Sequence, residues 1–200
     1  MVTKSIDYFF TVVSPWSWLG HARLVEVAAK HGALIHVKPI DLGRVFPVSG
    51  GLPLAKRAPQ RQAYRLVELA RWRDYLDVPI NLQPKFGTSS GLLAERWILA
   101  AAELGTPQAL ALAGAIMRAR WVEERDIAAA DTLAEIASSN RLDAAALAAR
   151  AGAPEVTECQ DALTQEAIAR GVFGAPTYIV GEEMFWGQDR LDFLDRKLAQ

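Results

Sequence analysis

The sequence has few residues that bind metals or carry out thiol chemistry. Its 200 residues include one cysteine, Cys159, and three histidines, His21, His31 and His36. A single thiol excludes an intramolecular disulfide and a dithiol redox centre, and it leaves no set of cysteine ligands for zinc. Because the histidines are not spaced with carboxylates as metal ligands usually are, we predict no metal site.

The sequence also has no excess of positive or negative charge and no long apolar run. The formal net charge is −1, so no overall field attracts nucleic acid or an acidic membrane. No apolar run approaches the roughly 20 residues that span a bilayer. The apolar stretch at residues 8–13 follows Asp7 and precedes no small-residue cleavage site, so we expect no signal peptide and a cytoplasmic location. Hydrophobic residues make up 51% of the chain, which is typical of a folded globular domain.

The first forty residues alternate between strand and helix patterns. Residues 6–12 are rich in β-branched and aromatic side chains and predict a buried strand. Ser14 is a good helix N-cap before Pro15, and helical periodicity then continues to Gly32. Residues 34–37 predict a second strand, so we expect a parallel strand–helix–strand unit.

The middle of the chain is helical and interrupted by two loops. Glycine and proline are concentrated in residues 46–58 and 81–91, and both segments predict loops. Helical periodicity covers residues 64–78, 92–104, 108–121, 131–138, 143–150 and 154–171. Asp131 and Asp143 are the expected caps of two of these helices.

The end of the chain returns to strand periodicity. Residues 177–180 and 183–186 predict a β-hairpin, and Asp189 is expected to cap a last amphipathic helix. Without the helical block, the order βαβ–α–ββα is that of a thioredoxin fold.

We therefore predict an α/β thioredoxin-like fold with a large all-helical insertion. Residues 1–41 and 154–200 would form the thioredoxin-like domain, and residues 42–153 the inserted helical domain.

A first motif, Ser14-Pro15-Trp16-Ser17, lies where thioredoxin-fold oxidoreductases carry Cys-x-x-Cys. The helix N-terminus there stabilises an anion such as a thiolate. Serine performs no dithiol chemistry, but its hydroxyl can donate a hydrogen bond to the thiolate of another molecule. Taken alone, Ser14 is better explained as a simple helix cap, because Ser-Pro helix starts are common.

A second motif, Gly174-Ala175-Pro176-Thr177, precedes the hairpin. Thioredoxin-like proteins carry a cis proline at this place, so the predicted fold implies one here, with the N–H and C=O groups of Ala175 free to bond the backbone of a peptide-like ligand. An ordinary proline at the start of a strand is the alternative.

A third segment, Gly187-Gln188-Asp189, joins the last strand to the last helix. Its backbone N–H groups suit a carboxylate and Asp189 suits an ammonium group. Asp189 as a simple helix cap remains the alternative.

Three stretches together resemble one family: IDYFF…SPWSWLGHARL, AKRAPQRQAYRLVELARWRDYLDVP and GVFGAPTYIVGEEMFWGQDRLDFL. They resemble 2-hydroxychromene-2-carboxylate isomerases and are similar to kappa-class glutathione transferases, both in the DsbA-like superfamily. The resemblance implies a homodimeric enzyme with glutathione as cofactor and a small aromatic acid as substrate. The implied reaction is a cis–trans isomerisation through a transient glutathione adduct in aromatic catabolism. The alternatives are a kappa-type transferase or peroxidase and a non-catalytic peptide-binding module.

The resemblance also implies roles for particular residues. Ser14 would activate the glutathione sulfur. The other implied glutathione contacts are Arg61, Ala175, Pro176, Gly187, Gln188 and Asp189. The substrate would lie near Trp16, Phe46, Lys56, Arg57 and Phe86. Phe46 and Phe86 occupy the positions where naphthalene-degrading isomerases have a lysine and a tyrosine. The cation and the phenol that are lost there could be replaced by Lys56, Arg57 or Lys85.

Overall fold

Four strands form one mixed sheet in the computed structural model, which describes residues 4–200. The strands are β1 (Ser5–Phe10), β2 (Leu34–Pro39), β3 (Thr177–Val180) and β4 (Glu183–Trp186), in the order β2-β1-β3-β4. β1 is parallel to β2 and antiparallel to β3, and β3 is antiparallel to β4. The predicted parallel unit and the C-terminal hairpin are therefore confirmed. Residues 1–3 of the predicted first domain lie outside the described residues.

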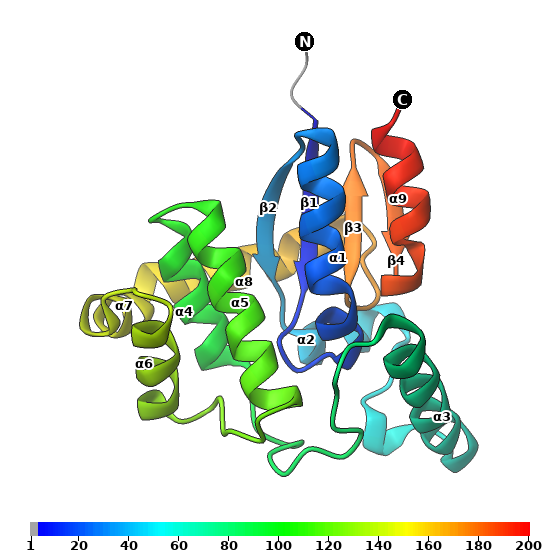
Figure 1. Cartoon of the computed structure of the whole chain (residues 1–200), viewed down its shortest axis with the longest axis horizontal. Coiled ribbons are helices and arrows are strands. Elements are labelled where there is room, and N and C mark those ends of the chain that lie inside the picture. Colours follow the sequence, from blue (N-terminus) through cyan, green and yellow to red (C-terminus); the bar gives the residue numbers. More distant parts are fainter. Residues whose placement is uncertain (1–3) are drawn as a thin grey trace.

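Helices cover both faces of this sheet. Helices α1 (Pro15–His31) and α9 (Leu191–Leu198) lie on one face, and α8 (Pro154–Ala169) lies behind the sheet in Figure 1. The side chains of β1 alternate accordingly. Tyr8 belongs to the main core cluster, and Phe9 to a second cluster on the opposite face.

The segment between β2 and α8 is helical, as predicted. It contains α2 (Leu42–Ser49), a 3-10 turn η1 (Leu54–Lys56), α3 (Pro59–Leu76), α4 (Leu92–Ala102), α5 (Thr106–Trp121), α6 (Ala130–Ser139) and α7 (Ala144–Ala151). Helices α4 to α7 pack beside the sheet, whereas α2 and α3 lie beyond the end of the sheet where β1 finishes (Figure 1). Trp97 of α4 and Leu112 of α5 join the same core cluster as Tyr8. The division into two domains stays a prediction.

Two predicted boundaries between β2 and α4 are wrong. Residues 46–49 belong to helix α2 rather than to a loop, because Asp41 caps that helix by accepting from Gly43 N–H at 2.7 Å and Val45 is buried. Helix α3 begins at Pro59 rather than at residue 64, since proline suits the first helical turn.

Of the three predicted aspartate caps, only one is confirmed. The Asp143 carboxylate accepts from the Ala146 N–H at 3.0 Å. Asp131 lies inside the first turn of α6, where Ala129 occupies the cap position. Asp189 lies in a 3-10 turn, η2 (Gln188–Arg190), and Arg190 occupies the cap position of α9. Within residues 4–200, no helix is both long enough and apolar enough to cross a membrane.

Candidate active site

A cavity of about 810 Å³ opens at the N-terminal end of α1. Its lining includes Ser14, Pro15 and Trp16 from the start of α1, and Gly174 and Ala175 from the segment before β3. The first two sequence motifs therefore meet in one place. The volume lies in the range of small-molecule sites, about 300–1,000 Å³.

Ser14 makes two hydrogen bonds with its hydroxyl group. The oxygen accepts from the Ser17 N–H at 3.2 Å, which makes Ser14 the predicted N-cap of α1. The hydroxyl donates to the carbonyl oxygen of Ala175 at 3.0 Å. The Ala175-Pro176 bond is cis, as predicted. The prediction that both backbone groups of Ala175 are unpaired is wrong for the carbonyl, because the buried Ser14 hydroxyl reaches it.

The turn that leads into Ser14 is held by a buried acid on α4. Glu95 is 1% exposed, and its carboxyl group accepts from the Thr11 hydroxyl at 2.6 Å and the Val12 N–H at 3.2 Å. On its other side, the carboxyl accepts from the Gln160 side chain at 3.2 Å. Burial raises the pKa of Glu95 to about 7. These bonds also explain why β1 ends at residue 10 rather than at residue 12, since residues 11 and 12 turn toward α4.

Four arginines line the cavity, namely Arg57, Arg61, Arg65 and Arg120. Among the described residues, no aspartate or glutamate lines the cavity, and none of these four arginines has a carboxylate within ion-pair distance. Burial lowers the pKa of the Arg65 guanidinium, and the positive charge of Arg57 lowers it further. The cavity is therefore suited to an anion.

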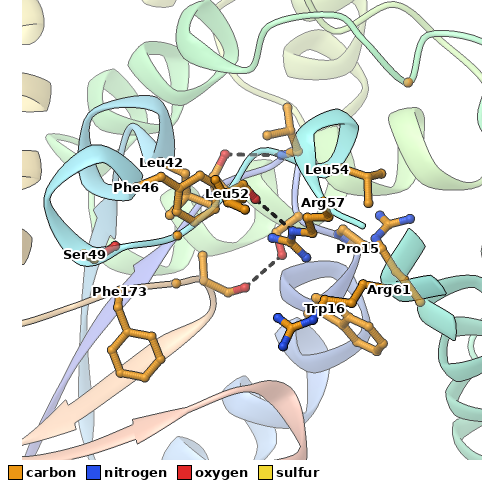
Figure 2. Close-up of a pocket in the computed structure, with 18 of the residues that line it drawn as sticks. Pro15, Trp16, Leu42, Phe46, Ser49, Leu52, Leu54, Arg57, Arg61 and Phe173 are labelled. Atoms are coloured by element: carbon orange, nitrogen blue, oxygen red, sulfur yellow. Dashed lines mark hydrogen bonds between the residues drawn. The ribbon is translucent and has the colours of Figure 1, made fainter. Parts of the chain in front are cut away.

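Apolar side chains form much of the remaining lining, together with a few serine and threonine residues. In Figure 2, Leu42, Phe46 and Leu52 group on one side, and Trp16 lies on the other side with Arg61. The Phe46 ring fits because Gly51 has no side chain. A Cβ atom at Gly51 would lie 2.2 Å from Cδ1 of Phe46.

A second apolar contact borders the Ala175 segment. The Phe173 and Trp186 rings pack with centroids 4.7 Å apart. A Cβ atom at Gly174 would lie 2.4 Å from Nε1 of Trp186. Glycine at this position therefore lets Trp186 lie against the chain just before Ala175.

Two predicted substrate residues are not in the cavity lining. Lys56 is exposed at the end of η1, and Phe86 lies beside the loop residues that do line the cavity, with the Lys85 ammonium 5.2 Å from its ring centre. Trp16, Phe46 and Arg57 are in the lining, and their contact with a substrate stays a prediction.

The predicted γ-glutamyl segment lies beside the cavity but not in its lining. The Gly187 N–H donates to the Pro176 carbonyl at 2.9 Å. Gln188 is 2% exposed, and its side-chain oxygen accepts from Arg23 at 3.0 Å. Asp189 accepts from the neighbouring Arg190 at 2.7 Å. Their contacts with glutathione stay a prediction.

Sequence reasoning did not identify Glu95, Arg65 or Arg120. A signal existed for Arg65, because it follows Arg61 by four residues and so shares its helix face. Glu95 stands out as an acid in the apolar helix LLAERWILAAA. Nothing in the local sequence marks Arg120.

Comparisons with known proteins agree with this geometry. The family model for the DSBA-like thioredoxin domain matches residues 5–199. The chain is 33% identical to the 2-hydroxychromene-2-carboxylate isomerase of Sphingobium xenophagum, over 98% of this chain and 99% of that protein. It is 26% identical to glutathione S-transferase kappa 1 of Homo sapiens, over 98% of this chain and 92% of that protein.

A solved structure of 2-hydroxychromene-2-carboxylate isomerase superposes on the chain with a TM-score of 0.86. The two are 28% identical, and the match covers 98% of this chain and 94% of that one. The resemblance inferred from the three sequence stretches is confirmed. The chain therefore belongs to the DSBA-like thioredoxin family, in the branch that contains the 2-hydroxychromene-2-carboxylate isomerases.

Proposed function

We propose that the protein is a glutathione-dependent isomerase of small aromatic acids resembling 2-hydroxychromene-2-carboxylate. The observation that carries the proposal is the placement of Ser14. Its hydroxyl lies at the N-terminus of a 17-residue helix, in a cavity that four arginines and several aromatic rings line. The full-length similarity to named isomerases supports the same reaction class.

The residues of the cavity fit glutathione. The helix N-terminus and the Ser14 hydroxyl favour a thiolate, and the unpaired arginines favour carboxylates. When bound, glutathione supplies a thiolate that adds reversibly to an electron-poor carbon of the substrate, permits rotation about the adjacent bond and is released unchanged.

The chain's own residues would bind and orient both molecules. To reach a thiolate, the Ser14 hydroxyl rotates its proton away from the Ala175 carbonyl, and stabilising the anion lowers the thiol pKa. That carbonyl is then free to accept from the ligand's backbone N–H. Arg61, exposed at the cavity edge, would hold a glutathione carboxylate, with Gln188 and Asp189 near the γ-glutamyl end.

The substrate would lie against the apolar side of the cavity. Trp16 and Phe46 offer faces for an aromatic ring, and Arg57 offers a guanidinium. Lys56 and Phe86 have no direct part in this arrangement, because their side chains are outside the cavity lining.

Glutathione binding and thiol ionisation test the proposal. Calorimetry would measure binding to the wild type, Ser14→Ala and the matched control Ser138→Ala, whose serine is exposed on α6. Thiolate absorbance against pH would give the thiol pKa. We expect micromolar to millimolar binding and a lowered thiol pKa in the wild type and the control, with the lowering lost in Ser14→Ala. An absence of glutathione binding would overturn the proposal and favour a peptide-binding module.

Product analysis separates the isomerase from the kappa-type transferase, to which the similarity with the human kappa enzyme also points. An isomerised acid with glutathione recovered unchanged supports the isomerase. A stable glutathione conjugate or oxidised glutathione as the end product supports the transferase or peroxidase.

We also propose a cytoplasmic homodimer. Reduced thiols persist in the cytosol, where such an enzyme finds its cofactor. Light scattering after size-exclusion chromatography should give about twice the chain mass of 21.9 kDa. A mass equal to one chain would refute the dimer.

A further inference from the structure

We propose that Arg120 binds the carboxylate of the aromatic substrate, at a site separate from the α3 arginines that face glutathione. This inference rests on the proposed function, and it names the residue that recognises the acid. Arg120 lies near the end of α5 and lines the cavity together with Gly87 and Ser89.

The positive charge of Arg120 is buried without an ion-pair partner in the described part of the chain, and the Asp126 carboxylate acts on it only from beyond contact distance. The residue is 2% exposed, and within residues 4–200 no carboxylate lies in ion-pair distance of it. Its Nη atoms donate to the carbonyl oxygens of Ser89 at 3.1 Å and Gly87 at 2.7 Å, whereas its buried Nε has no partner. A guanidinium has five N–H donors, and buried charges in proteins are normally paired. An anion in the cavity would supply the missing partner.

The guanidinium is also held in a fixed place. The two carbonyl bonds orient it, and it lies over the Trp121 ring at 5.4 Å from the ring centre. Trp121 donates from its indole N–H to the Val12 carbonyl at 3.1 Å, two residues before Ser14. Arg120 is therefore tied to the turn that carries Ser14. This prior ordering reduces the entropy lost when a ligand binds.

The surroundings of Arg120 suit an aromatic acid better than a second peptide-like ligand beside glutathione. A carboxylate accepts two hydrogen bonds from one guanidinium, and the same cavity presents Trp16 and Phe46 to a planar ring. Arg61 and Arg65 come from α3, so glutathione and substrate can each have a cationic partner.

Paired ligands that differ only in charge test the inference. Calorimetry with S-methylglutathione present would measure cinnamate, an aromatic acid, and cinnamamide, its neutral amide. We expect the wild type to bind cinnamate about tenfold or more tightly than cinnamamide. Arg120→Met should lose this preference, while its affinity for glutathione stays within about twofold of the wild type. The matched control is Arg118→Met on the same helix, which removes an exposed arginine paired with Glu123 and should retain the preference.

A measurement on the wild type covers the case in which Arg120→Met does not fold. The NMR signal of the Arg120 Nε–H, assigned from its absence in Arg120→Lys, should shift on addition of cinnamate and not of cinnamamide. An unshifted signal, or an unchanged preference in folded Arg120→Met, would overturn the inference. Neither result overturns the proposed function, which is tested separately by glutathione binding and by product analysis.

Discussion

The Ser14 hydroxyl donates a hydrogen bond to the Ala175 carbonyl at 3.0 Å, across 161 positions of sequence. The same oxygen caps α1 by accepting from the Ser17 N–H. One side chain therefore fixes the start of the first helix, joins it to the segment before β3 and carries the proton that we assign to thiolate binding. This relationship links stability and function at one residue.

Replacing Ser14 should lower stability as well as activity. Ser14→Ala removes the helix cap and the bond to Ala175, so we expect the free energy of unfolding to fall by about 1–2 kcal/mol. Ser14→Thr keeps a hydroxyl and should recover most of the loss. Urea unfolding of both variants and of Ser138→Ala measures this effect. An unchanged free energy of unfolding for Ser14→Ala would mean that the helix cap contributes nothing to stability.

Glu95 should make stability fall between acid and neutral pH. Its pKa is about 7 in the folded protein against 4.5 for the unperturbed group, so the folded state keeps a proton that the unfolded chain releases. The free energy of unfolding should thus decrease as pH rises from about 4.5 to about 7, by an amount on the order of 3 kcal/mol. The contribution is fully present below the unfolded pKa.

The variant Glu95→Gln should remove this decrease, since its amide does not titrate. Urea unfolding at a series of pH values, with the difference taken between the two proteins, isolates the effect. His21, whose pKa burial lowers, acts in the opposite direction but is present in both proteins. A pH-independent difference would show that the pKa of Glu95 is the same in the folded and the unfolded protein.

Arg61→Met should weaken glutathione binding by about tenfold, because it removes a charged hydrogen-bond donor from the cavity edge. Arg71→Met is the matched control on the same helix, since Arg71 is exposed and pairs with Glu68. Lys56→Met should leave binding near the wild-type value, because Lys56 does not line the cavity. Calorimetry measures the glutathione affinity of the three variants. A larger loss of affinity in Lys56→Met than in Arg61→Met would contradict the assignment of Arg61 as the glutathione contact.

Gly174→Ala should displace Trp186, because the new Cβ would lie 2.4 Å from Nε1 of the indole. Trp186 is already 52% exposed and can move outward, so we expect a red-shifted tryptophan emission and a loss of about 1–3 kcal/mol in stability. Repeating the substitution in a Trp186→Phe background isolates this indole among six tryptophans. Gly152→Ala, where a Cβ meets nothing closer than 3.5 Å, is the control. Identical spectra for Gly174→Ala and the wild type would show that the contact is absent.

Elements with strong local signals were predicted well. The Ser14-Pro15 helix start, the Gly32 helix end and the β3–β4 hairpin all follow from the chemistry of a few adjacent residues. Helix α2 was missed because the prolines and glycines around residues 46–58 mask it, and burial of Val45 stabilises it. Asp189 was assigned as a cap from its type alone, although the 3-10 turn places it one residue too early.

The amino-acid sequence by itself determined the thioredoxin-type order of elements and the two serine and proline motifs of the site. Local hydrogen bonding and periodicity are sufficient for both, because they involve neighbouring residues. Only the tertiary structure decided which charged side chains face the cavity. Arg120 of α5 lines the cavity and Glu95 of α4 accepts hydrogen bonds from the residues before Ser14, whereas Lys56 is outside the cavity lining. Side-chain direction depends on how helices pack against the sheet, and that packing is a property of the whole chain.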